Sequence, residues 1–408
     1  MNTYLLKQSV LLVVSAWILS MVSTVAAGEK LKIFILAGQS NMVGHANPHT
    51  IATLYHSDDP RDKALSQLVF KKGSGISNEV LEKQLVLARK IDALTGGISN
   101  DKMKAMSDGP EKMALEAEVQ KLKDAHEAYK KHVNDACVVS DRVYIHSIAD
   151  RSEKSGKLGI GYGGGGKKLG PEFGFGLSIS EKIEGPILLI KTSWGGKSLN
   201  YDFRPPSAGE YELNEKQKSG DKTDEIKKNA GLYYRLMHES VQDALSNLKD
   251  KHPAYDSDEG YEIAGFVWFQ GFNDQFSPEF RDNYQANMVS FIKDVRKTYQ
   301  APNMPFIIGV LGTGVTAEKV AENAVSTGQR EAAKVPEFKD NVLAVESYTE
   351  YSLFSNEIFS KGWPKHYHEW DIVGSDRPYH YLGSGTFFVR LGDAFAKSMA
   401  DLLEKQKN

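Results

Sequence analysis

The fold is decided by the stretch Leu31-Lys-Ile-Phe-Ile-Leu-Ala-Gly-Gln-Ser-Asn-Met42. Its apolar, β-prone run from residue 33 to residue 37 predicts a buried strand. Gly38 permits a sharp turn, so Ser40 comes at the carboxyl end of the strand, where open α/β sheets place their chemistry. A serine on such a strand-to-helix turn is a candidate nucleophile, because its Oγ is exposed and backbone N–H groups point at the same place. The alternative is a serine that only caps the next helix.

Further strand-like runs alternate with helix-like segments along the chain. The predicted strands are residues 31–37, 138–147, 186–192, 261–270, 305–311 and 342–345, and predicted helices include residues 231–248 and 280–299. Short apolar strands that alternate with helices predict an α/β fold with a parallel sheet covered on both faces. Residues 386–404 carry apolar side chains at helical spacing and predict the helix that closes the domain.

A polar, charged segment interrupts this alternation at about residues 60–134. Apolar or aromatic residues recur there at alternating steps of four and three: Leu115, Val119, Leu122, His126, Tyr129 and Val133. This spacing predicts a helical hairpin inserted into the α/β domain, with residues 82–94 as the antiparallel partner. Such a hairpin is either a solvated packing element or a wall of a cleft or partner surface.

Residues 1–27 have the pattern of a secretory signal. Lys7 precedes an apolar run at residues 10–22, and the small residues Ala26-Ala27 suit a cleavage site, which leaves residues 28–408 as the mature domain. A membrane anchor is the alternative, but the apolar run is shorter than the ~20 residues that span a bilayer. We therefore expect export to the periplasm or the medium, with no membrane span after signal removal.

Bulk composition narrows the classes of partner. A hydrophobic content of 41% supports a sizeable core, and a net charge of −3 argues against nucleic acid as a partner. Cys137 is the only cysteine, which excludes an intramolecular disulfide and, for an exported chain, favours a bacterial source. Cys137 has no turn glycine beside it, so a thiol nucleophile is not expected.

Two other predicted turns carry groups suited to acyl transfer. Gly195-Gly196 follows the strand at 186–192, and its backbone can approach a ligand and offer an N–H to an oxyanion. Asn273 follows the strand at 261–270, and an Asn side chain is a known type of oxyanion donor. Each motif alone also suits an ordinary turn or helix cap.

His380 precedes the last helix and is the candidate general base. A catalytic imidazole needs a carboxylate on Nδ1 to fix its tautomer while Nε2 takes the serine proton. Asp376 is near in sequence and could supply this carboxylate.

The other histidines form no recognisable metal motif. His45, His49 and His56 lie in one polar loop, and His366 and His368 lie in another. Their spacing matches no ligand set, so we expect surface positions and no metal.

Taken in order, the motifs resemble those of SGNH hydrolases of the sialate O-acetylesterase and acetylxylan esterase type. The motifs that carry the resemblance are Gly38-Gln-Ser-Asn-Met42, Gly170-Pro-Glu172, Gly195-Gly196, Trp268-Phe-Gln-Gly-Phe-Asn-Asp274 and His380. The resemblance implies a flavodoxin-like, three-layer α/β/α sandwich. It also implies removal of acetyl groups from carbohydrates without a metal or organic cofactor.

By this resemblance Ser40 is the nucleophile and His380 the base, and the oxyanion hole is formed by Ser40 N–H, Gly196 N–H and the Asn273 side chain. One position departs from the family. SGNH enzymes usually have Asp-x-x-His, whereas Arg377 stands three residues before His380 and Asp376 stands four before it. Either this turn is one residue longer, or another acid acts, or Ser40 and His380 work as a dyad; we favour Asp376.

An acetylated carbohydrate is the expected partner. We expect the side chains that contact it to be Gln39, Trp194, Tyr201, Asp202 and Arg204. For Trp194, Tyr201, Asp202 and Arg204, packing of an ordered loop is an equal alternative. Two other functions remain open: a catalytically inactive exported carbohydrate-binding protein on this scaffold, or an adaptor that binds partners through the helical insertion.

Overall fold

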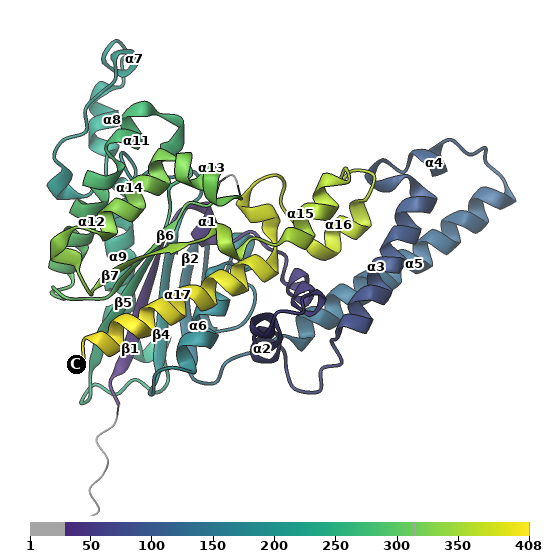
Figure 1. Ribbon diagram of the computed structural model, residues 1–408, viewed down its shortest axis with the longest axis horizontal. Coiled ribbons are helices and arrows are strands. Elements are labelled where there is room, and N and C mark those ends of the chain that lie inside the picture. The colour runs from purple at the N-terminus through teal and green to yellow at the C-terminus, as the bar shows by residue number, and fades with distance from the viewer. Residues whose placement is uncertain (1–28, 314, 408) are drawn as a thin grey trace, which may run out of the picture.

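The computed structural model describes residues 29–313 and 315–407; the expected signal sequence lies outside them. A seven-stranded sheet runs through the molecule in the order β3-β2-β4-β1-β5-β6-β7 (Figure 1). The strands are β1 Leu31–Gly38, β2 Val143–Ala149, β3 Ser152–Lys157, β4 Ile187–Ser193, β5 Tyr261–Phe269, β6 Phe306–Val310 and β7 Val342–Glu346. Six strands are parallel, and β3 pairs antiparallel with β2 at one edge. The predicted α/β fold is confirmed, with an additional edge strand that the sequence analysis missed.

β1 lies at the centre of the sheet because its residues are apolar on both faces. Its buried run pairs with β4 on one side and β5 on the other. The register places Gly38 opposite both Ser193 and Phe269, so the three strands end level with one another. The turns that follow them therefore meet at the same edge of the sheet.

Helices cover both faces of the sheet and form the outer layers (Figure 1). α6 (Pro171–Ser180) and α17 (Gly385–Lys405) contribute to the hydrophobic core on one face. α9 (Leu232–Ser246), α12 (Tyr284–Thr298) and α14 (Ala324–Ala333) contribute to the core on the other face. The arrangement is a three-layer α/β/α sandwich.

The closing helix α17 was predicted at 386–404 and packs directly on α6. Ser384 caps its first turn by accepting a hydrogen bond from Phe387 N–H. The two helices approach closely at glycines: a Cβ on Gly174 would lie 2.4 Å from the Val389 carbonyl oxygen, and one on Gly392 would lie 2.4 Å from Phe175 N. Larger residues would push the helices apart.

A second group of helices projects from one side of the sandwich (Figure 1). It comprises α2 Pro60–Val69, α3 Asn78–Thr95, α4 Asp101–Lys104, α5 Pro110–Ala136, α15 Leu353–Ser360 and α16 Tyr367–Val373. α3 packs against α5, and α16, from a distant part of the chain, packs against α3. On α5 the predicted seam is buried at Val119, His126, Tyr129 and Val133, whereas Leu115 and Leu122 are half-buried.

Short helices make up most of the remaining connections. They are α1 Ser40–Val43, η1 Pro48–His56, η2 Gly97–Ser99, η3 Gly164–Gly166, η4 Pro206–Ala208, α7 Glu215–Lys218, α8 Thr223–Asn229, α10 Leu248–Lys251, η5 Asp274–Phe276, α11 Pro278–Asp282, α13 Ala317–Glu322, η6 Pro336–Phe338, η7 Tyr348–Glu350 and η8 His380–Gly383. Within residues 29–313 and 315–407, no helix combines the length and apolarity needed to cross a bilayer.

Candidate active site at the carboxyl edge of the sheet

Ser40 is the first residue of α1, directly after the turn that follows β1, and is half-buried. Gly38 makes this turn possible, because a Cβ at that position would lie 2.2 Å from the Phe269 carbonyl oxygen. Within the described chain, Ser40 Oγ has one recorded hydrogen bond, from Gln39 Nε2 at 3.4 Å. The hydroxyl is thus held at the sheet edge with capacity for another partner.

Gln39 links the Ser40 turn to the turn after β5. Its Oε1 accepts hydrogen bonds at 3.2 Å from the backbone N–H groups of Gly271 and Asn273, and from Gln270 Nε2. Its Nε2 donates to Asn273 Oδ1 at 3.0 Å. Gln39 was expected to contact substrate, but its side chain is fully buried and saturated by protein groups. The structure instead gives it a positioning role.

The same contact sets the direction of the Asn273 amide. Because Oδ1 accepts from Gln39, Nδ2 is free to face the Gly195-Gly196 turn, and a Cβ on Gly196 would lie 4.0 Å from this nitrogen. A Cβ on Gly195 would lie 3.9 Å from Ser40 Cβ. Three of the predicted groups, Ser40, Gly196 and Asn273, therefore converge.

Asp150, which the sequence analysis did not single out, shapes the Gly-Gly turn. It follows β2 in a left-handed conformation (φ 57°), and its Oδ1 accepts a 2.6 Å hydrogen bond from Gly195 N–H. Gly196 has φ 69°, and its N–H has no acceptor among the described residues. The Gly196 N–H is thus left available as a donor beside Ser40. Asp150 was missed because the strand before it was expected to end at residue 147.

Asp274, another residue without a predicted role, holds the loop that follows the glycines. Its buried carboxylate accepts hydrogen bonds of 2.9–3.0 Å from the backbone N–H groups of Leu199 and Asn200, and another from Gln270 Nε2. Burial raises the pKa of Asp274 to about 7, against the effect of these donors. The sequence feature that could have identified Asp274 is its position directly after Asn273.

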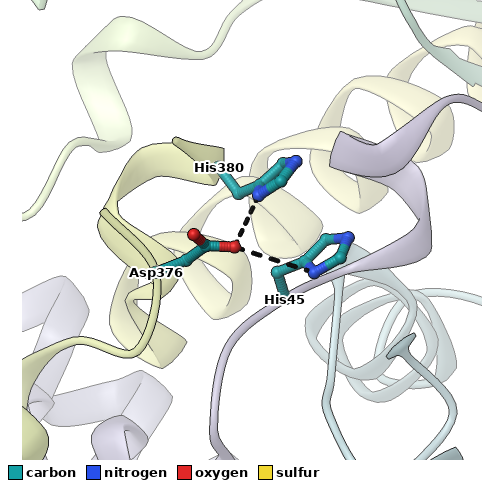
Figure 2. Close-up of side chains that lie close together, drawn as sticks. All are labelled: His45, Asp376 and His380. Atoms are coloured by element: carbon teal, nitrogen blue, oxygen red, sulfur yellow. Dashed lines mark hydrogen bonds and ion pairs between the residues drawn. The ribbon is translucent and has the colours of Figure 1, made fainter. Parts of the chain in front are cut away.

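His380 and Asp376 lie together despite the extra residue between them. His380 Nδ1 is 2.7 Å from Asp376 Oδ2, and the intervening turn brings the imidazole back over the carboxylate (Figure 2). Burial opposes ionisation of Asp376, but the hydrogen bond and charge of His380, together with His45, hold its pKa below the ordinary value. Residues 380–382 all adopt positive φ (51°, 52° and 62°), a strained backbone of the kind found at functional sites.

His45 forms a third member of this group. Its ring stacks on His380 with centroids 4.0 Å apart and an interplanar angle of 14°, and its Nδ1 is 3.8 Å from Asp376 Oδ2. The Nε2 atoms of both rings point away from Asp376 and to the same side (Figure 2). Burial, reinforced by His380, lowers the pKa of His45 to about 4, so this ring is neutral at ordinary pH.

Ser375 ties the His380 loop to the loop that follows Ser40. Its Oγ accepts from Asn47 N–H at 2.9 Å and lies 2.9 Å from the His45 carbonyl oxygen, to which it can donate. No hydrogen bond joins Ser40 Oγ to His380 within the part of the chain that the structure describes. Such contacts often tighten only when substrate binds.

A buried ion pair contacts the end of α1, the short helix that begins at Ser40. Lys191 on β4 donates to Glu172 Oε2 at 2.7 Å and to the carbonyl oxygens of Val43 and Tyr162 at 2.8 and 3.1 Å. Both charged side chains are completely buried. Burial lowers the pKa of Lys191 against the opposing charge of Glu172. The pair connects the end of α1 to α6 and β4.

The other four expected substrate contacts, Trp194 before the Gly-Gly turn and Tyr201, Asp202 and Arg204 after it, contact residues of the protein around them. Trp194 packs against Tyr233 and Phe203, with centroids 5.4 and 6.2 Å away. Tyr201 donates to the Ile226 carbonyl oxygen. Asp202 accepts from Ser198 N and Oγ, and Arg204 donates to the carbonyl oxygens of residues 200, 208, 209 and 210. These contacts match the alternative of an ordered loop.

The expectation of surface histidines is wrong for three of the five. His49 and His368 are buried, and His45 is part of the stack described above. His368 is anchored by Asp92, whose carboxylate accepts from His368 N and contacts Nδ1 at 2.8 Å. Cys137 is also buried, which raises the pKa of its thiol to about 12 and suits no nucleophilic role.

Fold and site together place a hydroxyl, an imidazole–carboxylate pair and candidate oxyanion donors at the carboxyl ends of parallel strands in a three-layer α/β/α sandwich. The model of the family described as "Carbohydrate esterase, sialic acid-specific acetylesterase" matches residues 127–349, more than half of the chain. The chain therefore belongs to this carbohydrate esterase family. The matched segment includes Gly196 and Asn273, whereas Ser40 and His380 lie outside it.

Solved structures give weaker likenesses. A protein from Arabidopsis thaliana is 14% identical, with 91% of this chain and 98% of that chain covered and a TM-score of 0.43. NanS is 11% identical (94% and 99% covered, TM-score 0.45). A carbohydrate acetylesterase from Xanthomonas citri is 12% identical (77% and 49% covered, TM-score 0.36). Among curated proteins, no sequence matches this chain significantly.

Proposed function

We propose that the protein is a serine esterase that removes O-acetyl groups from carbohydrates through an acyl-enzyme. One observation carries this proposal: His380 Nδ1 lies 2.7 Å from Asp376 Oδ2, beside an edge where Ser40, Gly196 and Asn273 converge. Acyl transfer requires these groups and no others: a nucleophile, an oriented base and donors for the oxyanion.

In the first step His380 Nε2 takes the proton of Ser40 Oγ, which attacks the acetyl carbonyl carbon. The carbonyl oxygen becomes an oxyanion that accepts hydrogen bonds from Gly196 N–H, Asn273 Nδ2 and Ser40 N–H. The imidazolium of His380 is stabilised by Asp376 and by the face of neutral His45. It then protonates the leaving sugar oxygen as the ester bond breaks, which leaves acetyl-Ser40.

In the second step water replaces the sugar. His380 takes a proton from the water molecule, whose oxygen attacks the acetyl-Ser40 carbonyl, and the same donors hold the second oxyanion. Return of the proton to Ser40 Oγ releases acetate and restores the enzyme.

Acetate release from a panel of acetylated polysaccharides and sialic acids tests the proposal. We expect Ser40→Ala and His380→Ala to abolish release in parallel, because the pair acts as a unit. Asp376→Asn should cost about 10²-fold or more, since the wrong imidazole tautomer is then favoured. Ser219→Ala, an exposed serine on the α7–α8 connection, is the matched control.

Other outcomes identify the alternatives. Release of acetate by Ser40→Ala at the wild-type rate would reject the nucleophile assignment. Binding of glycans without acetate release, unaffected by Ser40→Ala, would instead identify a carbohydrate-binding protein on the same scaffold. An unchanged rate in Asp376→Asn would leave a Ser40–His380 dyad or a different acid.

We also propose that the chain is exported by its N-terminal signal. The charged start, the short apolar run and Ala26-Ala27 support this location. Amino-terminal sequencing of the mature protein should give Gly28 as the first residue. Retention of Met1 in the mature product would reject it.

A further inference from the structure

Five rings form a continuous row across the catalytic edge. Centroid separations are 4.0 Å for His45–His380, 6.3 Å for His380–Tyr379, 6.1 Å for Tyr379–Phe272 and 5.2 Å for Phe272–Phe276. The row joins the loop after α1, the turn before α17 and the turn after β5. It connects the imidazole pair to a set of purely aromatic side chains.

The outer three rings, Phe272, Phe276 and Tyr379, form what we term the aromatic ledge. Phe276 is 68% exposed and Tyr379 is 53% exposed, whereas Phe272 is half-buried and packs against the core. Exposed apolar surface costs about 25 cal/mol per Å² relative to burial. Two exposed rings that both contact the half-buried Phe272 form an apolar surface patch, and such patches indicate a binding position.

The chemistry of the site sets what can lie on the ledge. The carbonyl oxygen of the ester must face Asn273, and the leaving oxygen must face His380, which protonates it. Phe272 directly precedes Asn273, and Tyr379 directly precedes His380. The Tyr379 ring also lies 6.3 Å from the His380 ring, centroid to centroid, and 6.1 Å from the Phe272 ring. A group attached to the oxygen that His380 protonates can therefore reach the ledge.

We propose that the aromatic ledge binds the pyranose ring of the alcohol from which the acetyl group is removed. The inference rests on the proposed function and adds a substrate subsite to it. A pyranose presents a face of C–H groups that packs on aromatic rings while its hydroxyl groups stay in water. The exposed faces of Phe276 and Tyr379 suit such a one-sided contact.

The test compares two acetyl esters that differ only in the alcohol. One is a methyl pyranoside with a single O-acetyl group, and the other is methyl acetate, which has no ring to stack. The quantity measured is the ratio of the two kcat/KM values. We expect Phe276→Ala and Tyr379→Ala each to lower this ratio about fivefold to tenfold, mainly through KM for the pyranoside.

Two further variants make the result specific. Tyr379→Phe keeps the ring and should restore the wild-type ratio, because the contact needs the ring and not its hydroxyl. Leu353→Ala removes an equally exposed apolar side chain on α15 (71% exposed) and should leave the ratio unchanged.

The outcomes separate failure of the ledge from failure of the esterase. A wild-type protein that hydrolyses neither ester rejects the proposed function. If the wild-type protein hydrolyses both esters and neither alanine variant changes the ratio of their kcat/KM values, the sugar-binding role of the ledge is rejected and the proposed esterase function is not. Equal loss for both esters would show that the rings support the catalytic groups. Altered selectivity between methyl acetate and methyl butyrate would assign them to the acyl group; either result overturns the proposal.

Discussion

His45 and His380 stack face to face, 4.0 Å apart, and both direct Nδ1 at the same carboxylate oxygen of Asp376. In the proposed mechanism, the positive charge that His380 gains therefore arises between a carboxylate and the face of a neutral ring. A cation over an aromatic face is stabilised by about 0.5–2 kcal/mol. His45 thus reinforces the base without contacting the proton that moves.

Replacing His45 tests this interaction. We expect His45→Ala to lower kcat/KM about tenfold and to move the acid limb of its pH profile to lower pH, because the imidazolium loses a stabilising face. His45→Phe keeps a stacking face and should lose less than His45→Ala. A purely structural role for His45 would give equal losses in both variants and no movement of the acid limb.

Asn273 is expected to act on the transition state rather than on binding. Its Nδ2 faces the Gly-Gly turn, so Asn273→Ala removes one oxyanion donor and should lower kcat by about 10²–10³-fold with little change in KM. Steady-state kinetics on an acetyl ester measure both constants. Circular dichroism and thermal melting serve as the control, and a loss confined to KM would assign Asn273 to ground-state binding.

The buried Lys191–Glu172 pair should behave as a unit. Lys191→Met leaves Glu172 unpaired in a dry site, which we expect to destabilise the fold by about 3–5 kcal/mol in urea unfolding. The double variant Lys191→Met/Glu172→Gln removes both charges and should recover part of this loss. The single variant Glu172→Gln completes the comparison. If the double variant lost as much unfolding free energy as the two single variants together, the two side chains would not be coupled.

Asp274 gives a pH-dependent signature. With a pKa of about 7 in the folded state and 3.8 as its ordinary value, the folded protein binds more protons between these limits, so ionisation of Asp274 reduces stability as pH rises from about 4 to 7. Asp274→Asn cannot ionise. Its stability deficit relative to wild type should therefore shrink over this range, by up to about 4 kcal/mol.

Thermal or urea unfolding of both proteins at pH 4 to 8 measures this deficit. Other titrating groups, including His45, are present in both proteins and cancel in the difference. A deficit that stays constant or grows with pH would show that the backbone donors keep Asp274 ionised throughout.

Most of the sheet was predictable because its strands are continuous apolar runs. β1, β4 and β5 are buried on both faces, and only such runs fit the middle of a covered parallel sheet. β3 was missed because Ser152–Lys157 is polar and largely exposed. It joins the edge through backbone pairing with β2, which leaves little trace in side-chain pattern.

The positions of the candidate site followed from the same logic, because residues at the ends of neighbouring parallel strands must meet. Ser40, Gly195-Gly196 and Asn273 each follow a predicted strand, and the resemblance to SGNH hydrolases implied their grouping as nucleophile and oxyanion donors. The stacking of His45 on His380 could not be predicted, since the two residues are remote in sequence and a histidine in a polar loop is usually solvated. Gln39 was expected to contact substrate because the sequence does not reveal that its amide group forms hydrogen bonds with the turn after β5.

Ser375 Oγ, which joins the segments around residues 45–47 and 375–376, has a consequence for the life of the chain. This hydroxyl ties the loop that follows Ser40 to the loop that carries Asp376 and His380, although the two loops are far apart in the sequence. A molecule cleaved before residue 375 loses this tie together with His380, so we expect it to be inactive even with Ser40 intact. Proteolysis more than 300 residues from Ser40 in the sequence would thus abolish turnover.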